Sequence, residues 1–192
     1  MANKTTSKAK STKTATSTKS TAAKAEKAEA PVTKEPVKKV AIPKDVDINQ
    51  LITIYNGFDG ILVYKSPRTG EIFTWDAMGD VQDLELRELR SAKSSAKSFF
   101  SQNWFMFDED NQWVIDYLGV RKYYQNALGI DDFDGLFDRP ISELTAIIAG
   151  LSDGQRKSVG YRARQMVLDG EIDSRKTIAA LEEALGIELE MK

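Results

Sequence analysis

LITIYNGFDGILVYKSPRTGEIFTW, residues 51–75, alternates short runs of β-branched and aromatic residues with turn residues. The apolar runs cover 51–55, 61–64 and 72–75, and Asn56-Gly57 and Asp59-Gly60 are typical turn dipeptides. Short strands separated by tight turns predict an antiparallel meander, to which residues 81–86 add a candidate fourth strand. Three or four strands cannot enclose a core, so helices must cover one face of the sheet.

The chain after residue 85 supplies such helices. Apolar residues at helical spacing predict a helix over 86–101. Residues 104–107 are apolar without a helical period, which predicts a buried strand. A short helix over 113–117 is expected to end at Gly119. The residues on the apolar face of the first helix are Leu86, Leu89, Ala96 and Phe100.

Three more helices are expected in the last third of the chain. The first spans 141–150 and follows Pro140, which a first helical turn tolerates. Ser152 with Gln155 three residues later is the signature of a capping box. Asp173 or Ser174 caps a final helix that ends at Gly186. The fold class is therefore α+β: a small antiparallel β-rich module over 45–128, then a helical module over 129–192.

A basic tail precedes these modules. Residues 1–44 hold 11 Lys, no Arg and 3 Glu, a charge of 11 − 3 = +8, whereas residues 45–192 hold 16 basic and 26 acidic residues, a charge of −10. The tail is rich in Lys, Ser, Thr and Ala and has no aromatic residue. It has too little apolar surface to offset the entropy lost on folding, so we expect it to be disordered.

The missing residue types exclude whole classes of chemistry. The 192 residues include no Cys and no His. Thiol nucleophiles, disulfides, imidazole bases and thiolate or imidazole metal sites are therefore excluded. We expect no enzymatic activity, no catalytic residues, no cofactor and no small-molecule substrate. An enzyme that works through carboxylate, Lys or Tyr groups is left as an alternative, although no motif indicates a reaction.

Two motifs have ordinary structural explanations. Residues 150–154, GLSDG, match the G-x-S-x-G pattern of a nucleophile elbow, but the expected preceding strand and the histidine are both missing. We interpret the motif as a helix break followed by the Ser152 cap. Acidic clusters lie at 108–110, 131–135 and 169–173. The second cluster does not fit a calcium-binding loop, because Ile130 and Ile141 occupy the positions that its ligands require, and acids at helix starts and turns are the ordinary explanation. No metal site is predicted.

Basic residues mark two candidate contact surfaces. The tail lysines can neutralise phosphates, or they can anchor on an acidic protein. Without Arg and aromatic residues they cannot select a base sequence. The second surface is a one-sided stripe on the predicted helix over 86–101, for which a plain solvated face is the alternative. The tail candidates are Lys4, Lys8, Lys10, Lys13, Lys19 and Lys24, and the helix stripe is Arg87, Arg90, Lys93 and Lys97.

Aromatic residues are concentrated between residues 99 and 124. We expect most of them to form the core that joins the sheet to the helices. The alternative is an exposed patch for self-association.

The chain also resembles a family. The stretch Tyr64–Trp75, followed by Gly79-Asp80 and Glu88-Leu89, is similar to small accessory proteins of tailed bacteriophages. Residues 99–104, FFSQNW, and 169–174, DGEIDS, belong to the same resemblance, which covers most of residues 50–190 but not the tail. It implies a virion structural protein of the capsid, the head–tail junction or the tail, without catalytic residues.

Composition and resemblance together predict a non-enzymatic structural component of a phage virion that works through repeated protein–protein contacts. The expected partners are other virion proteins, copies of the chain itself, and DNA through the tail. The expected location is the virion, and the host cytoplasm during assembly. No apolar run is long enough to span a membrane, so we expect no membrane contact. The alternative function is sequence-nonspecific DNA binding by the tail.

Overall fold

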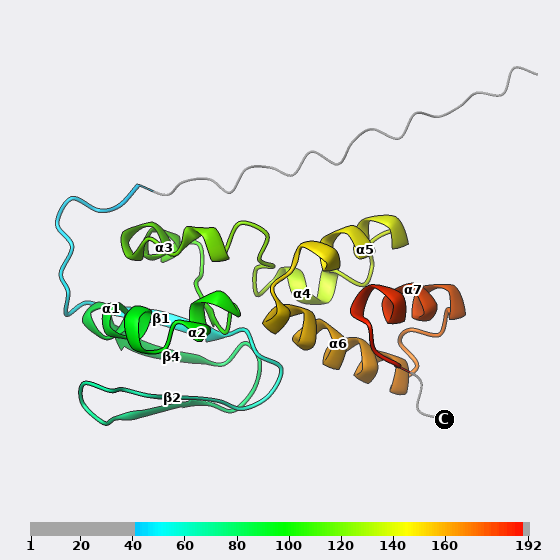
Figure 1. Ribbon diagram of the computed structural model, residues 1–192, viewed down its shortest axis with the longest axis horizontal. Coiled ribbons are helices and arrows are strands. Elements are labelled where there is room, and N and C mark those ends of the chain that lie inside the picture. Colours follow the sequence, from blue (N-terminus) through cyan, green and yellow to red (C-terminus); the bar gives the residue numbers. More distant parts are fainter. Residues whose placement is uncertain (1–40, 190–192) are drawn as a thin grey trace, which may run out of the picture. The chain divides into compact units, whose positions relative to one another are not determined.

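A computed structural model describes residues 41–189, apart from the side chain of Asp134 (Figure 1). The described residues belong to one compact unit. Antiparallel strands come first along the chain and helices dominate after residue 86, so the predicted α+β class is confirmed. Residues 1–40 of the tail predicted over residues 1–44 lie outside the described residues.

The strands form two small sheets. Strand β1 (Leu51–Asn56) is the middle of a three-stranded antiparallel sheet between β4 (Val81–Glu85) and β5 (Phe105–Met106). Strands β2 (Leu62–Lys65) and β3 (Ile72–Trp75) form a separate hairpin. The predicted meander is therefore wrong in its pairing, because β1 pairs with β4 and not with β2.

Asn56 explains why β1 does not turn back into β2. Its side-chain amide donates hydrogen bonds to the carbonyls of Gly60 and Ala77, both at 2.8 Å. The adjacent Gly57 N–H donates to the Trp104 carbonyl at 2.8 Å. The bonds to Ala77 and Trp104 fasten the end of β1 to the loops before β4 and β5, the strands that occupy its two edges, while the bond to Gly60 holds the β1–β2 loop.

The two sheets pack through their apolar faces. Ile52 and Ile54 of β1 and Leu84 of β4 are buried on one face of the larger sheet. In the hairpin, Tyr64 and Trp75 are buried, and Trp75 Nε1 donates to the Ile54 carbonyl at 3.0 Å. This alternation of buried and exposed residues is the period of two that the sequence predicts for the strands.

An aromatic cluster joins the sheets to the helices. The fully buried ring of Phe105 contacts four other rings at centroid distances of 4.7–5.6 Å. The predicted aromatic core is therefore confirmed for its buried members, and the other rings of the region pack half-buried against it. The rings around Phe105 are those of Tyr64, Trp75, Phe99 and Phe100.

The predicted long helix is divided in two. Helix α1 (Leu86–Ser95) ends at Ala96, whose φ of −136° and ψ of 48° are not helical, and the short helix α2 (Ser98–Ser101) follows. This break turns the chain so that Phe100 of α2 packs against Phe105. Helix α3 (Gln112–Leu118) ends at Gly119 with a φ of 67°, as predicted, and the 3-10 helix η1 (Arg121–Tyr123) comes next.

The remaining helices enclose a second core. They are α4 (Asp132–Gly135), α5 (Ile141–Gly150), α6 (Asp153–Leu168) and α7 (Arg175–Leu185), coloured yellow-green to red in Figure 1. The predicted N-caps are confirmed, because Ser152 Oγ accepts from the Gln155 N–H at 3.2 Å and Ser174 Oγ accepts from the Thr177 N–H at 3.4 Å. The capping box at Ser152 is confirmed only in this half, because the Gln155 side chain bonds Leu128. Completely buried members of this core are Leu136, Leu144, Ile148, Val159, Ala163, Leu181 and Leu189.

The start of α6 joins the second core to the first. Ser152 Oγ donates to the Gln102 carbonyl at 3.2 Å, and Ser158 Oγ donates to the Gly57 carbonyl at 3.1 Å. The Gln155 side chain bonds both the N–H and the carbonyl of Leu128. Along the chain, the last buried residue of the first core is Tyr124 and the first buried residue of the second core is Leu128, next to the predicted module boundary at 128/129. The division into two separate modules stays a prediction.

Candidate functional site

Four basic side chains gather where α1 approaches the end of α3. Arg90, Lys93, Lys97 and Lys122 are all exposed, and we name them the α1 cationic surface. None of them forms an ion pair with an acid of residues 41–189. They stand out because residues 45–192 carry a charge of −10. A set of free cations on an acidic body attracts an anionic partner.

The period of α1 explains why these side chains reach the surface. Leu86, Leu89 and Ala92 bury the adjacent face of α1 against the aromatic core, and each is completely inaccessible to solvent. Arg90 follows Leu89 and Lys93 follows Ala92 by one residue, so each is rotated by about 100° around the helix axis from that buried neighbour. The core thus fixes the helix, and the helix places the cations.

A shallow hollow lies within this surface. It has a volume of about 470 Å³ and is lined by Arg90, Lys93 and Ser94 of α1 and by Tyr117 and Leu118 of α3. Its titratable groups are two cations and one phenol. Such a lining has the chemistry to bind carboxylate or phosphate groups, and the phenol can add an apolar contact and a hydrogen bond.

Tyr123 connects the other two cations. Its hydroxyl is hydrogen-bonded to the side chains of Lys97 and Lys122. Desolvation raises the pKa of Tyr123, but these bonds and the two positive charges outweigh it, so the pKa lies below the usual tyrosine value. Lys122 and Tyr123 also line a second hollow of about 230 Å³, beside the turn between α5 and α6. The lowered pKa is thus a consequence of the same two lysines.

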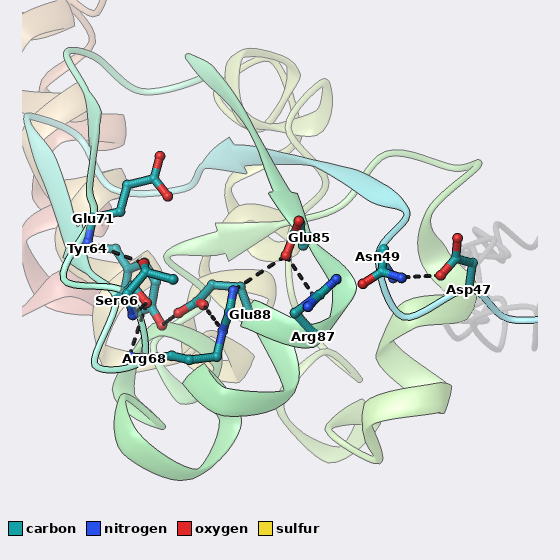
Figure 2. Close-up of polar contacts among 10 residues, drawn as sticks. Asp47, Asn49, Tyr64, Ser66, Arg68, Glu71, Glu85, Arg87 and Glu88 are labelled. Carbon is teal, nitrogen blue, oxygen red and sulfur yellow. Dashed lines mark hydrogen bonds and ion pairs between the residues drawn. The ribbon is translucent and has the colours of Figure 1, made fainter.

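A buried acid fixes α1 from its other side. Glu88 is only 3% exposed and accepts hydrogen bonds from Tyr64 Oη at 2.7 Å and Arg68 Nε at 3.1 Å (Figure 2). Ser66 donates a further bond to it. Burial by itself would raise the pKa of Glu88, but these hydrogen bonds and the charge of Arg68 lower it. The network fastens the β2–β3 hairpin to α1.

Glu85 takes one residue out of the predicted stripe. Its carboxylate pairs with Arg87 Nε at 2.9 Å and with Arg68 Nη2 at 3.4 Å (Figure 2). Arg87 is therefore half-buried and paired, whereas Arg90, Lys93 and Lys97 of the same prediction form no ion pair with an acid of the described residues. The predicted tail residues Lys4, Lys8, Lys10, Lys13, Lys19 and Lys24 lie outside the described residues.

The sequence alone did not place Lys122 or Tyr123 at this surface. They follow Lys97 by about 25 positions, and the turn after α3 returns them to it. The dipeptide Arg121-Lys122 was the one local signal, but Arg121 forms an ion pair with Asp116.

Comparison with protein-family models, curated proteins and solved structures gave no significant match. The resemblance to phage accessory proteins is therefore still a prediction from the residues. Within residues 41–189, no helix is both long and apolar enough to cross a membrane. The same part of the chain does not bring three or more acidic side chains together in a group that could hold a metal ion.

Proposed function

We propose that this chain is a non-enzymatic structural component of a bacteriophage virion, and that it works through repeated contacts with neighbouring proteins. The observation that carries the proposal is the α1 cationic surface, which places four cations without an ion pair among residues 41–189 on a body of net negative charge. The similarity of residues 64–75, 99–104 and 169–174 to phage accessory proteins supports the virion as the setting.

The buried groups with shifted pKa values favour a binding role over a catalytic one. Tyr64, Glu88 and Tyr124 are buried, and each is hydrogen-bonded to another group of the chain. Desolvation raises the pKa of both tyrosines well above the usual value, and the Glu88 hydrogen bond adds to this effect for Tyr64. None of the three lines the two hollows, so their shifts arise from core packing and not from groups directed at a substrate.

Particle composition tests the proposal. The gene is expressed together with the neighbouring genes of its genome, and virions are purified from the culture on a density gradient. The virions are then digested and analysed by quantitative mass spectrometry. We expect peptides of this chain in the particle fraction at a constant ratio to the major capsid protein. Peptides confined to the soluble lysate would contradict the proposal.

Sequence-nonspecific DNA binding is the second candidate. The 11 lysines among residues 1–44 favour it, because each phosphate contact releases counterions and the affinity then falls steeply with salt. We expect a full-length variant with Gln at positions 4, 8, 10, 13, 19 and 24 to bind duplex DNA more weakly, with a smaller salt dependence. Equal binding by the two proteins would eliminate the tail as the DNA-binding element.

A further inference from the structure

Opposite charges lie beside the two ends of helix α3, acids in the loop before it and cations of α1 beside its last turn. The loop before it contains Asp108, Glu109 and Asp110, and no Lys or Arg occurs between Lys97 and Arg121. Glu109 and Asp110 are exposed and form no ion pair with a basic residue of the described chain. At the far end, about 10 Å along a seven-residue helix, lies the hollow lined by Arg90 and Lys93.

This arrangement is self-complementary. When two copies of such a helix lie antiparallel across a two-fold axis, the acidic end of each faces the basic end of the other. The dipoles of the two helices are then antiparallel, and their electrostatic interaction is also favourable. One such contact therefore contains two acidic-to-basic pairings, so both charge clusters of both copies gain an oppositely charged neighbour.

We propose that the α1 cationic surface binds the acidic loop 108–110 of a second copy of this chain, in a two-fold symmetric contact. The proposal rests on the proposed function in one respect, namely that this surface serves a protein contact. Glu109 and Asp110 are the counter-charges for Arg90 and Lys93. Tyr117, on the wall of the hollow, is half-buried and supplies apolar area beside the charges.

A second copy fits this surface better than DNA does. A DNA duplex would approach a body with a charge of −10 and would meet the acidic loop within one helix length of the cations. The loop of a second copy turns that repulsion into attraction. Because the charges are exposed, the contact weakens with salt. By mass action, the dimer is more populated where copies are concentrated.

Sedimentation velocity of the full-length protein over a range of concentrations tests the proposal. At low salt we expect reversible dimers that dissociate at high salt. R90E/K93E and E109K/D110K are each expected to raise the dimer dissociation constant by about tenfold or more. Mixing these two variants restores dimers, because every facing pair in the mixed dimer is again opposite in charge. The matched control R175E/K176E reverses one exposed Arg and one exposed Lys on α7 and leaves dimerisation unchanged.

Three results would overturn the proposal: a monomer at all concentrations and salts, dimers that neither variant weakens, and variants that do not rescue each other. If R90E/K93E instead abolishes DNA binding by a monomeric protein, the surface is a nucleic-acid site. Failure of the proposed function is a separate outcome. If particles lack the chain, the proposed virion role is wrong but the proposed dimer can still be right. If the chain is found in particles but is monomeric in solution, only the proposed dimer is wrong.

Discussion

Replacement of Gly154 by alanine is a direct test of how α6 packs. A Cβ atom at this position would lie 2.3 Å from the Gln102 carbonyl oxygen and 2.7 Å from the Gln102 Cβ. The obstacle includes backbone, which a side-chain rotation cannot remove. The start of α6 must therefore move away from residue 102, and the hydrogen bonds of Ser152 and Ser158 across this junction weaken with it.

Opposing terms set the size of the effect. Overpacking costs ~1–3 kcal/mol, and the one or two weakened hydrogen bonds cost about 1 kcal/mol each. Alanine recovers at most about 1 kcal/mol through its higher helix propensity. We expect Gly154→Ala to lower the free energy of unfolding by ~3 kcal/mol. For a domain of this size, that lowers Tm by roughly 6–12 °C.

Two other glycines provide matched controls. A Cβ on Gly135 meets nothing within 4 Å, and one on Gly160 meets only the terminal methyl of Ile187 at 2.8 Å, which can rotate away. We expect Gly135→Ala to stay within ~0.5 kcal/mol of the parent and Gly160→Ala to lie between the other two. Urea denaturation followed by circular dichroism gives all three values. If Gly154→Ala is as stable as Gly135→Ala, the packing of α6 on residue 102 is refuted.

Three further predictions follow from the hydrogen-bond networks. Glu88→Gln removes the charge that Arg68 contacts, so we expect it to destabilise the fold at neutral pH by ~1.5–3 kcal/mol. Because the folded pKa of Glu88 lies below the usual 4.5, its contribution is complete above 4.5 and is lost as the pH falls through the folded value. Urea denaturation must therefore show the gap between parent and variant narrowing in acid; a gap that widens there would contradict the network. Lys122→Met removes one of the cations that lower the pKa of Tyr123, so the first phenol to ionise in an absorbance titration moves to higher pH; an unchanged titration would exclude this contact. Ser152→Ala removes the α6 cap and the hydrogen bond to the Gln102 carbonyl, so we expect thermal unfolding to show a free energy of unfolding lower by ~1–2 kcal/mol. An unchanged stability would show that the cap is unimportant.

Local signals predicted four of the helix ends correctly. Ser152, Ser174, Gly119 and Gly186 act on backbone groups within a few positions of themselves, so neighbouring residues are sufficient to identify them. The period of α1 likewise predicted which of its faces is buried. These features depend on residues that are close together in the sequence, where spacing carries the information.

Long-range contacts account for what the sequence did not reveal. The pairing of β1 with β4 follows from Asn56, whose amide joins positions 60 and 77, and no pattern within the strands specifies those partners. The break at Ala96 positions Phe100 against Phe105, another contact that helical spacing does not specify. At the candidate site, the fold brought Lys122 to the surface.

Zero-length cross-linking of intact virions, followed by mass spectrometry, tests most directly whether this chain works through the α1 cationic surface. The carbodiimide reagent joins Lys only to carboxylates in direct contact with it. We expect Lys93, Lys97 or Lys122 to be joined to Asp or Glu of a neighbouring polypeptide, with Glu109 or Asp110 of a second copy among the products. Virions that contain the chain but yield no such product, while their major capsid protein cross-links normally, would contradict this account.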